Sequence, residues 1–332
     1  MRKAILTTGI ILMLMSLLTV SCKKGKIDKL PIAETNVDED TCTCVSVPKI
    51  PGYSNGYNHL YESEVISTPI FNTNDDNEIL YIITSFSPYE KKLVKYNLVS
   101  KQKTILFTGQ IFGFPAWSKL NWIVFANGYN GLYRIRPDGS SLSLFIAGGY
   151  QFSPAFNEEG DKLLTFHSFA NQYQFPCKIW NTDGLLIDSM NYKVNQEPKW
   201  KRQNNIAYRR DDKIFILNPE TKEIIKSHET FLGSFPTYSH GFAWLNEDYA
   251  IVEHGYNIKK LNVWSGELTK LFCGCDSRKY LVSDANEDGT KVLFNKIVYK
   301  VKQEGVPQNL LVYASISIYD LQTNTVTDIE ID

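Results

Sequence analysis

Hydrophobic and polar positions alternate in short blocks from about residue 65 to the end of this chain. Apolar runs of four or five residues, rich in β-branched and aromatic side chains, are separated by polar turns that contain Gly, Pro, Asn or Asp. Such runs are typical of buried strands, and turn residues of these types preset or permit the dihedral angles of a hairpin. C-terminal to Cys22 no segment keeps a helical period for more than two turns. The pattern therefore predicts an all-β protein.

A unit of four short strands recurs six times, although imperfectly. In each copy the first strand ends on an equivalent position, which is aromatic in five of the six copies and recurs every 39 to 46 residues. This position is occupied by Phe71, Trp117, Phe156, Trp200, Trp244 and Ala285. Self-similarity at this period, with four strands per unit, is typical of β-propeller blades. We therefore expect a six-bladed β-propeller of four-stranded blades over residues 65–332, with seven blades as the alternative.

The third copy carries a motif that resembles the TolB-like propeller repeat. It reads Ser-Pro-Ala-Phe-Asn-Glu-Glu-Gly-Asp-Lys from Ser153 to Lys162, and the hallmark of the family is Pro-x-aromatic followed by an acidic turn closed by Gly-Lys. Residues 116–118 and 286–291 are partial copies. The resemblance implies the fold and no chemistry. The chain has no room for the additional N-terminal α/β domain of TolB, so a role in the Tol–Pal system does not transfer.

The N-terminus has the features of an export signal. Arg2 and Lys3 precede an apolar run over residues 4–20, and residues 18–22 resemble the bacterial lipobox, with Thr19 where Leu is usual. The resemblance implies cleavage after residue 21 and a diacylglyceryl anchor on Cys22. The alternative is an uncleaved anchor helix. We expect a signal peptide over residues 1–21, a flexible polar tether over 22–41 and a segment packed on the propeller over 42–64.

The expected location follows from this signal. A lipid-anchored chain belongs to the bacterial cell envelope, with the membrane as a partner through Cys22. Lys23 stands where an Asp is linked to retention in the inner membrane, so by analogy we expect the outer membrane. The formal net charge of −1 offers no basic footprint for nucleic acid, which we exclude as a partner.

The chain has six cysteines, of which four form two Cys-x-Cys pairs. An exported protein folds in an oxidising compartment, so we expect Cys42 and Cys44 to form disulfides with Cys273 and Cys275. A four-thiolate zinc site is the alternative, although the spacing within each pair is tighter than usual. We expect Cys177, at the start of a third strand, to be a buried thiol.

Candidate ligand-binding residues gather in the loops that enter each first strand and in those that join the second strand to the third. In a propeller these loops share one face, and here they are rich in Tyr, Arg and His, which suits a glycan or a protein ligand. The alternative is that these aromatics simply cap the blades of a chain with 13% aromatic residues. The candidates are Tyr89, Tyr129, Tyr150, His167, Tyr173, Arg209, Tyr238, His240, His254, Tyr256 and Tyr280.

Three functions are compatible with these residues. The favoured one is a binding propeller without catalysis, because the sequence contains no nucleophile elbow, zinc-protease, phosphate-loop or dinucleotide motif, and we expect no cofactor. The second is a carbohydrate-active lyase or hydrolase that uses His167, His240 or His254 with loop carboxylates and a divalent metal. The third is a scaffold for a partner protein.

Two further segments have alternative interpretations. Residues 72–77 begin like a calcium-binding loop but lack Glu at the twelfth position, so we interpret them as the turn between the first two strands. Residues 297–314 are the longest insertion between a second and a third strand. Their alternating pattern predicts that the two strands extend into a long hairpin, which could serve as an interaction arm.

Overall fold

The computed structural model describes residues 58–61, 64–148, 151–167, 177–190, 198–200, 204–210, 213–229, 241–254, 256–275, 278–301 and 309–331. Blade 1 comprises β2 (Glu64–Asn72), β3 (Asp75–Phe86), β4 (Tyr89–Asn97) and β5 (Lys103–Gly109). Blade 2 comprises β6 (Ile111–Trp117), β7 (Ile123–Asn127), β8 (Gly131–Ile135) and β9 (Ser143–Ala147). Blade 3 comprises β10 (Gln151–Phe156), β11 (Lys162–His167), β12 (Cys177–Asn181) and β13 (Leu186–Met190). Blade 4 comprises β14 (Lys199–Trp200), β15 (Ile206–Arg210), β16 (Lys213–Asn218) and β17 (Glu223–Glu229). Blade 5 comprises β18 (Phe242–Trp244), β19 (Tyr249–His254), β20 (Asn257–Asn262) and β21 (Leu268–Cys273). Blade 6 comprises β22 (Arg278–Ala285), β23 (Lys291–Val301), β24 (Asn309–Asp320) and β25 (Thr325–Ile329).

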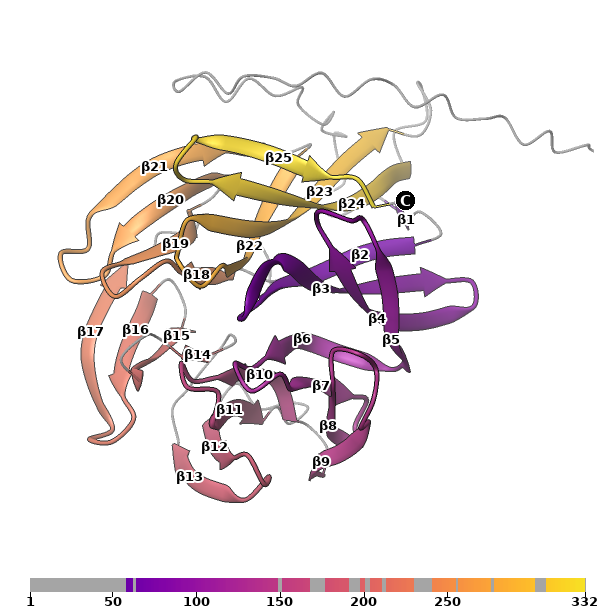
Figure 1. Ribbon diagram of the computed structural model, residues 1–332. Helices are drawn as coiled ribbons and strands as arrows, with labels where there is room; N and C mark the ends of the chain where they lie inside the picture. Colours follow the sequence, from indigo (N-terminus) through magenta and orange to yellow (C-terminus); the bar gives the residue numbers. More distant parts are fainter. Residues whose placement is uncertain are drawn as a thin grey trace, which may run out of the picture. The chain divides into compact units, whose positions relative to one another are not determined.

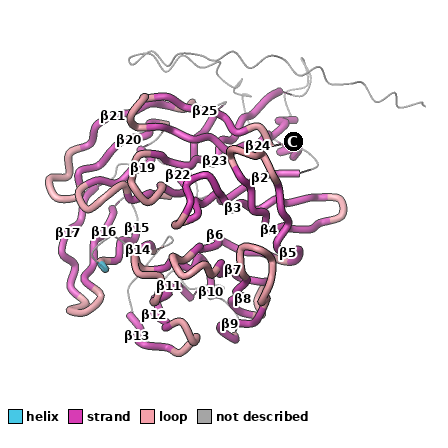
Figure 2. Tube along the Cα trace, in the orientation of Figure 1, coloured by secondary structure: helices cyan, strands magenta, loops and turns pink. Residues whose placement is uncertain are grey.

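Each blade is an antiparallel sheet of four strands that follow one another in the chain, and the six blades are arranged as a β-propeller (Figure 1). The described part of the chain contains strands, turns and loops, a single 3₁₀-helical position at Asn204 and no α-helix (Figure 2). The prediction of an all-β, six-bladed propeller is therefore confirmed, and the seven-bladed alternative is wrong.

Six hydrophobic clusters hold the blades together, one at each junction between neighbouring blades. Leu80 of blade 1 and Phe125 of blade 2, both fully buried, belong to the cluster between these two blades. Leu293 of blade 6 and Tyr81 of blade 1 belong to the cluster that closes the ring. Burial of each such side chain contributes about 1.5–3 kcal/mol. Because both faces of a blade pack on a neighbour, the second strands are apolar without interruption.

The register of the first two strands confirms the repeat. Phe71 pairs with Ile79, the first residue of the apolar run in the second strand. The equivalent aromatic positions of the other blades pair in the same way, as Trp117 does with Ile123. The residues that repeat in the sequence therefore occupy equivalent positions in the pairing of the first strand with the second strand.

The residue after the aromatic position organises the turn to the second strand. In blade 3 this residue is Asn157, whose Oδ1 accepts the backbone N–H of Lys162 at 2.8 Å. Its Nδ2 donates to Glu159 and Asp161, both at 2.7 Å. Gly160 has a φ of +76°, and a Cβ at this residue would approach the backbone of blade 2 at 3.0 Å. The acidic Gly turn of the motif therefore has a structural role in this blade.

Among the described strands, β22 to β25 complete the four strands of blade 6 without a strand from blade 1. Side-chain contacts close the ring instead. The Phe71 N–H donates to Asp284 Oδ2 at 3.0 Å, and the Ser283 hydroxyl donates to the Pro69 carbonyl at 2.5 Å. The Asn286 amide of blade 6 donates to Asp76 of blade 1 at 2.7 Å.

A fifth strand lies beside blade 6. β1 (Asn58–Tyr61) pairs in parallel with residues 309–312 of β24, whose register with β25 begins only at Ile316. β23 and β24 remain paired as far as Val301 and Leu310, so the predicted long hairpin is confirmed.

Candidate functional site

The strand order gives the propeller two functional faces. We call the side with the connections into first strands and between second and third strands the loop face, and the opposite side, with the connections between first and second and between third and fourth strands, the turn face. The candidate residues that the structure describes lie on the loop face. The structure adds a cavity in the central channel, nearer the turn face.

Blades 2 and 3 carry an aromatic cluster on the loop face. Phe112, at the start of β6, lies 5.6 Å from the Tyr129 ring and 6.1 Å from the Phe152 ring, measured between centroids. Phe166 extends the cluster, 6.3 Å from Phe152. Tyr129, in the connection from β7 to β8, is 60% exposed although it rests on this cluster. An exposed ring supported by half-buried rings offers a preorganised contact for a ligand.

A second pair of exposed aromatics lies at the tip of the β3–β4 hairpin. Phe86 and Tyr89 face each other in the register, with centroids 6.4 Å apart. They are 41% and 61% exposed. Tyr129 lies in the β7–β8 connection as predicted, whereas Tyr89 is the first residue of β4, directly after the β3–β4 connection.

Lys91 connects blade 1 to the aromatic cluster. Its Nζ donates to the Ile111 carbonyl at 2.7 Å and lies 5.1 Å from the centre of the Phe112 ring. Burial lowers the pKa of Lys91. None of the described carboxylates forms an ion pair with it, in contrast to the adjacent Lys92, which pairs with Glu64 and Glu90. The sequence analysis did not single out Lys91, because its position depends on the contact between two blades.

The loop face of blades 4 to 6 is more polar. Arg209 and Glu253 are both buried, and Glu253 accepts the Val282 N–H at 2.6 Å. Burial, together with the charge of Lys259, lowers the pKa of the half-buried His254. His254 is therefore neutral at pH 7.

Tyr280 and Tyr256 are half-buried and contact other parts of the propeller, so they are less exposed than Tyr129. Tyr280 packs edge-on against Phe272, with centroids 5.1 Å apart, and burial raises its pKa. The carbonyl of the half-buried Tyr256 accepts the Gly274 N–H at 2.7 Å.

Several candidates lie outside the described residues, so their role stays a prediction. This applies to Tyr150, Tyr173, Tyr238 and His240, and to the side chain of His167. In the described part of the chain no group of three His, Cys, Asp or Glu could hold a metal ion. Of the three histidines of the enzyme alternative, His254 has a described side chain and the side chains of the other two lie outside the described part, so that alternative stays a prediction.

Sequence analysis missed a cavity of about 210 Å³ in the central channel. First strands of all six blades contribute to its wall, mainly with apolar and aromatic side chains. Turn residues Lys119, Glu158 and Glu287 also line it, but within the first strands two lining residues are charged, Lys199 and Asp284. Lys199 Nζ donates to the Ser283 carbonyl at 2.5 Å and lies 5.7 Å from the rings of Phe114 and Phe242. Burial raises the pKa of Asp284, and the charge of Lys199 opposes this shift.

A sequence signal for this pair did exist. Lys199 and Asp284 precede the repeated aromatic position by one residue, where the other copies have Ile70, Ala116 and Ala155 or the equivalent Ala243. Opposite charges at an otherwise apolar position indicate that the two residues share a site. None of the described loop-face candidates lines this cavity.

The described connections of the turn face are acidic. Its described connections contain Lys101, Lys119, Arg136 and Lys222 as cations. Their carboxylates are Asp138, Glu158, Glu159, Asp161, Asp183, Glu220, Glu247, Asp248, Glu267, Glu287 and Asp288.

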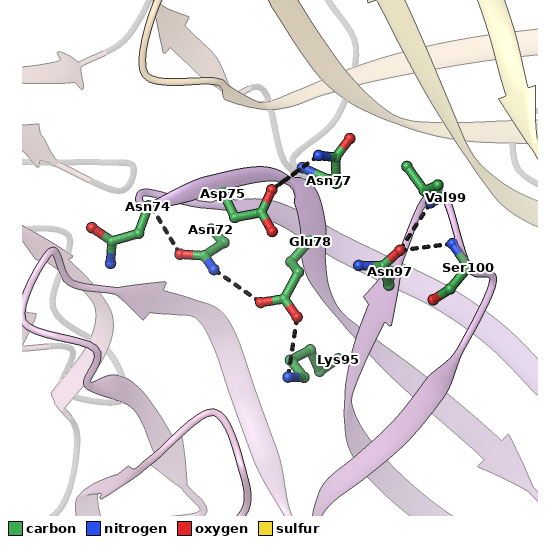
Figure 3. Close-up of polar contacts among 9 residues, drawn as sticks. All are labelled: Asn72, Asn74, Asp75, Asn77, Glu78, Lys95, Asn97, Val99 and Ser100. Atoms are coloured by element: carbon green, nitrogen blue, oxygen red, sulfur yellow. Dashed lines mark hydrogen bonds and ion pairs between the residues drawn. The ribbon is translucent and has the colours of Figure 1, made fainter.

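Figure 3 shows why residues 72–77 form a turn. Asn72 Oδ1 accepts the Asn74 N–H at 2.9 Å and Asp75 Oδ1 accepts the Asn77 N–H at 2.9 Å. Asn72 also donates to Glu78, which pairs with Lys95 at 3.2 Å. These oxygens are used within the turn, so the interpretation as a turn and not a calcium loop is confirmed.

Three of the six cysteines, Cys177, Cys273 and Cys275, lie in the described part of the chain. Cys177 is free and buried, as predicted. Cys273 ends β21 and Cys275 follows it, both buried at 5% and 8% exposure. Residues 42–44 lie outside the described residues, so the disulfides between the two pairs stay a prediction.

Comparison with solved structures places this architecture among known folds. TolB from Acinetobacter baumannii aligns with a TM-score of 0.56 at 11% identity, over 76% of this chain and 63% of that chain. The fold is a TolB-like six-bladed β-propeller. A chain of a nidogen/laminin complex aligns with a TM-score of 0.50 at 12% identity, over 62% of this chain and 79% of that chain. No protein-family model and no curated protein sequence matches the chain.

These likenesses extend to the fold and no further. An oligogalacturonate lyase in complex with manganese aligns with a TM-score of 0.47 at 11% identity, over 79% of this chain and 77% of that chain, which carries no argument about activity. This chain spans less than two thirds of the TolB chain. In the described residues no helix is long and apolar enough to cross a membrane.

Proposed function

We propose that this protein is a lipid-anchored binding protein of the bacterial cell envelope, held in the outer membrane through Cys22. Its propeller binds a protein or a glycan through the loop face and performs no catalysis on it. The observation that carries the proposal is the exposed Tyr129 ring, supported from below by Phe112.

The exposed aromatics support binding because their exposure has a free-energy cost in the free protein. Tyr89, Tyr129 and Phe86 present large apolar surfaces to water on one face, and covering such surface contributes about 25 cal/mol per Å². Tyr and Phe also lose little conformational entropy on binding, because they have few rotatable bonds. A surface of this kind is typical of a recognition site.

The test is a thermal-shift screen of the purified chain against oligosaccharides, peptidoglycan fragments and envelope extracts. A ligand that binds only the folded state raises the melting temperature in step with its concentration. We expect the shift to disappear in the double variant Tyr89→Ala/Tyr129→Ala and to persist in Trp264→Ala, which removes a partly exposed aromatic of the turn face. A ligand that binds all three proteins equally would exclude the loop face.

The anchor is tested separately. We expect labelled fatty acid to be incorporated into the wild-type chain in bacteria and not into Cys22→Ala, which should leave the membrane fraction. Unchanged labelling and fractionation of this variant would contradict the anchor without bearing on the loop face.

A further inference from the structure

We propose that the loop-face ligand is a carboxylate-bearing glycan whose acidic sugar occupies a subsite formed by Lys91, Phe112 and Tyr129. This inference rests on the proposed binding function of that face and names the chemistry of its ligand. It comes from three observations: an unpaired cation, an exposed ring beside it and the distribution of charge between the two faces.

The cation is Lys91. Among the described residues its ammonium has one acceptor, the Ile111 carbonyl, and a ring at 5.1 Å, so donors remain for a ligand. No described carboxylate neutralises it, whereas Lys92, Lys95 and Lys213 all form ion pairs. A partly buried ammonium without a counter-ion favours an anion, because the missing charge is not supplied by the protein.

The ring is Tyr129. Phe112 contacts both the Lys91 ammonium and the Tyr129 ring, so cation and platform belong to one cluster. An aromatic face packs on the C–H face of a pyranose, and its hydroxyl offers a polar contact at the edge. A sugar that carries a carboxylate would use both features at once, with the ring on Tyr129 and the carboxylate at Lys91.

The charge distribution supports an anionic ligand. The turn-face connections that the structure describes carry more carboxylates than cations. Near the loop face, Lys259 of blade 5 and Arg278 of blade 6 lie at the beginnings of their strands, and like Lys91 they form no ion pair among the described residues. The described turn-face connections therefore disfavour a polyanion, which leaves the loop face as the more favourable side for one.

The experiment measures the Kd of the purified chain by calorimetry for a uronic acid oligosaccharide, its methyl ester and an acidic peptide of similar length and charge. Each is measured at low and high salt. The variants are Lys91→Met, which keeps the aliphatic stem, Lys91→Arg, which keeps the charge, and Tyr129→Ala. Lys226→Met, which removes an exposed lysine from the outer strand of blade 4, is the matched control. Melting temperatures verify that each variant folds.

We expect the acidic oligosaccharide to bind more tightly than its ester and to weaken with salt. A charge-assisted hydrogen bond corresponds to a loss of roughly 10- to 100-fold in Lys91→Met, with recovery in Lys91→Arg. Tyr129→Ala should weaken both the acid and the ester by roughly 3- to 10-fold, and Lys226→Met should change neither.

Two results would overturn the inference. Equal affinity for acid and ester, unaffected by Lys91→Met, would exclude an acidic sugar but leave a neutral glycan on the Tyr129 platform, in agreement with the proposed function. Binding of the acidic peptide alone, lost in Tyr129→Ala, would exclude a glycan and identify a protein ligand. The general function fails only if its own screen finds no ligand that depends on Tyr89 or Tyr129.

Discussion

Asn286 is the side chain whose removal tests how the ring is closed. It is 2% exposed and lies in the turn from β22 to β23. Its Oδ1 accepts the Lys291 N–H at 2.7 Å, which closes its own turn. Its Nδ2 donates to Asp76 of blade 1 at 2.7 Å and to Thr290 at 3.2 Å. Asn286→Ala removes all three contacts.

The expected loss follows from these contacts. A hydrogen bond to a charged group contributes about 1.5–3 kcal/mol, and a buried N–H left without an acceptor costs about 1–3 kcal/mol. Because water can reach part of the turn, we expect the free energy of unfolding to fall by about 3 kcal/mol.

Asn246 in blade 5 is the matched control. It accepts two backbone N–H groups in the equivalent turn, at 2.9 and 3.0 Å, but it is exposed. Asn246→Ala should cost only about 1 kcal/mol.

Urea unfolding, followed by tryptophan fluorescence and circular dichroism, measures both variants. Equal losses for Asn286→Ala and Asn246→Ala would refute the claim that the Asn286 side chain holds blade 6 to blade 1.

Asn286→Asp adds a second check, because it places a carboxylate against Asp76. Mutual repulsion raises the pKa of such a pair in the folded state, so the stability of this variant should fall as pH rises through those pKa values and recover in acid.

Three further predictions follow from buried or paired groups. Burial raises the pKa of Cys177 to about 12, so this thiol should resist alkylation at neutral pH until urea unfolds the chain; rapid labelling of the folded protein would contradict its burial. Burial also raises the pKa of Asp284, so the folded state binds a proton more tightly, and the stability of the wild type relative to Asp284→Asn should fall as pH rises above about 4; a difference that is constant between pH 3 and 7 would exclude this. Peptide mapping without reductant should join residues 42–44 to Cys273 and Cys275, and free thiols or bound zinc there would contradict the disulfides.

The blades could be predicted because their signals are local. The aromatic that ends a first strand, the acidic Gly turn and the apolar run that follows all lie within about 15 residues, and strand period and turn chemistry act over that range. The register of Phe156 with Leu163 is therefore readable from the third copy by itself. To predict the buried second strands it was enough to know that each blade has a neighbouring blade on both faces.

The cavity and the Lys91 subsite could not be predicted in the same way. Lys199 and Asp284 are 85 residues apart in the chain, and Lys91 meets Phe112 only because blade 2 packs beside blade 1. Such contacts depend on how blades pack, which a single repeat does not encode. The charged exceptions at the apolar motif position were visible in the sequence, but their meaning required the closed ring.

The two faces of this propeller use their polar residues for different purposes. On the turn face, Asn72 and Asn157 fill their hydrogen-bonding positions within their own turns, and Asn286 adds a bond to the neighbouring blade. A substitution there changes stability. On the loop face, Tyr89 and Tyr129 are more than half exposed and contribute little to the packing of the blades. Their replacement should therefore change binding with little effect on unfolding, and it is this separation that allows one fold to acquire a ligand without weakening its ring.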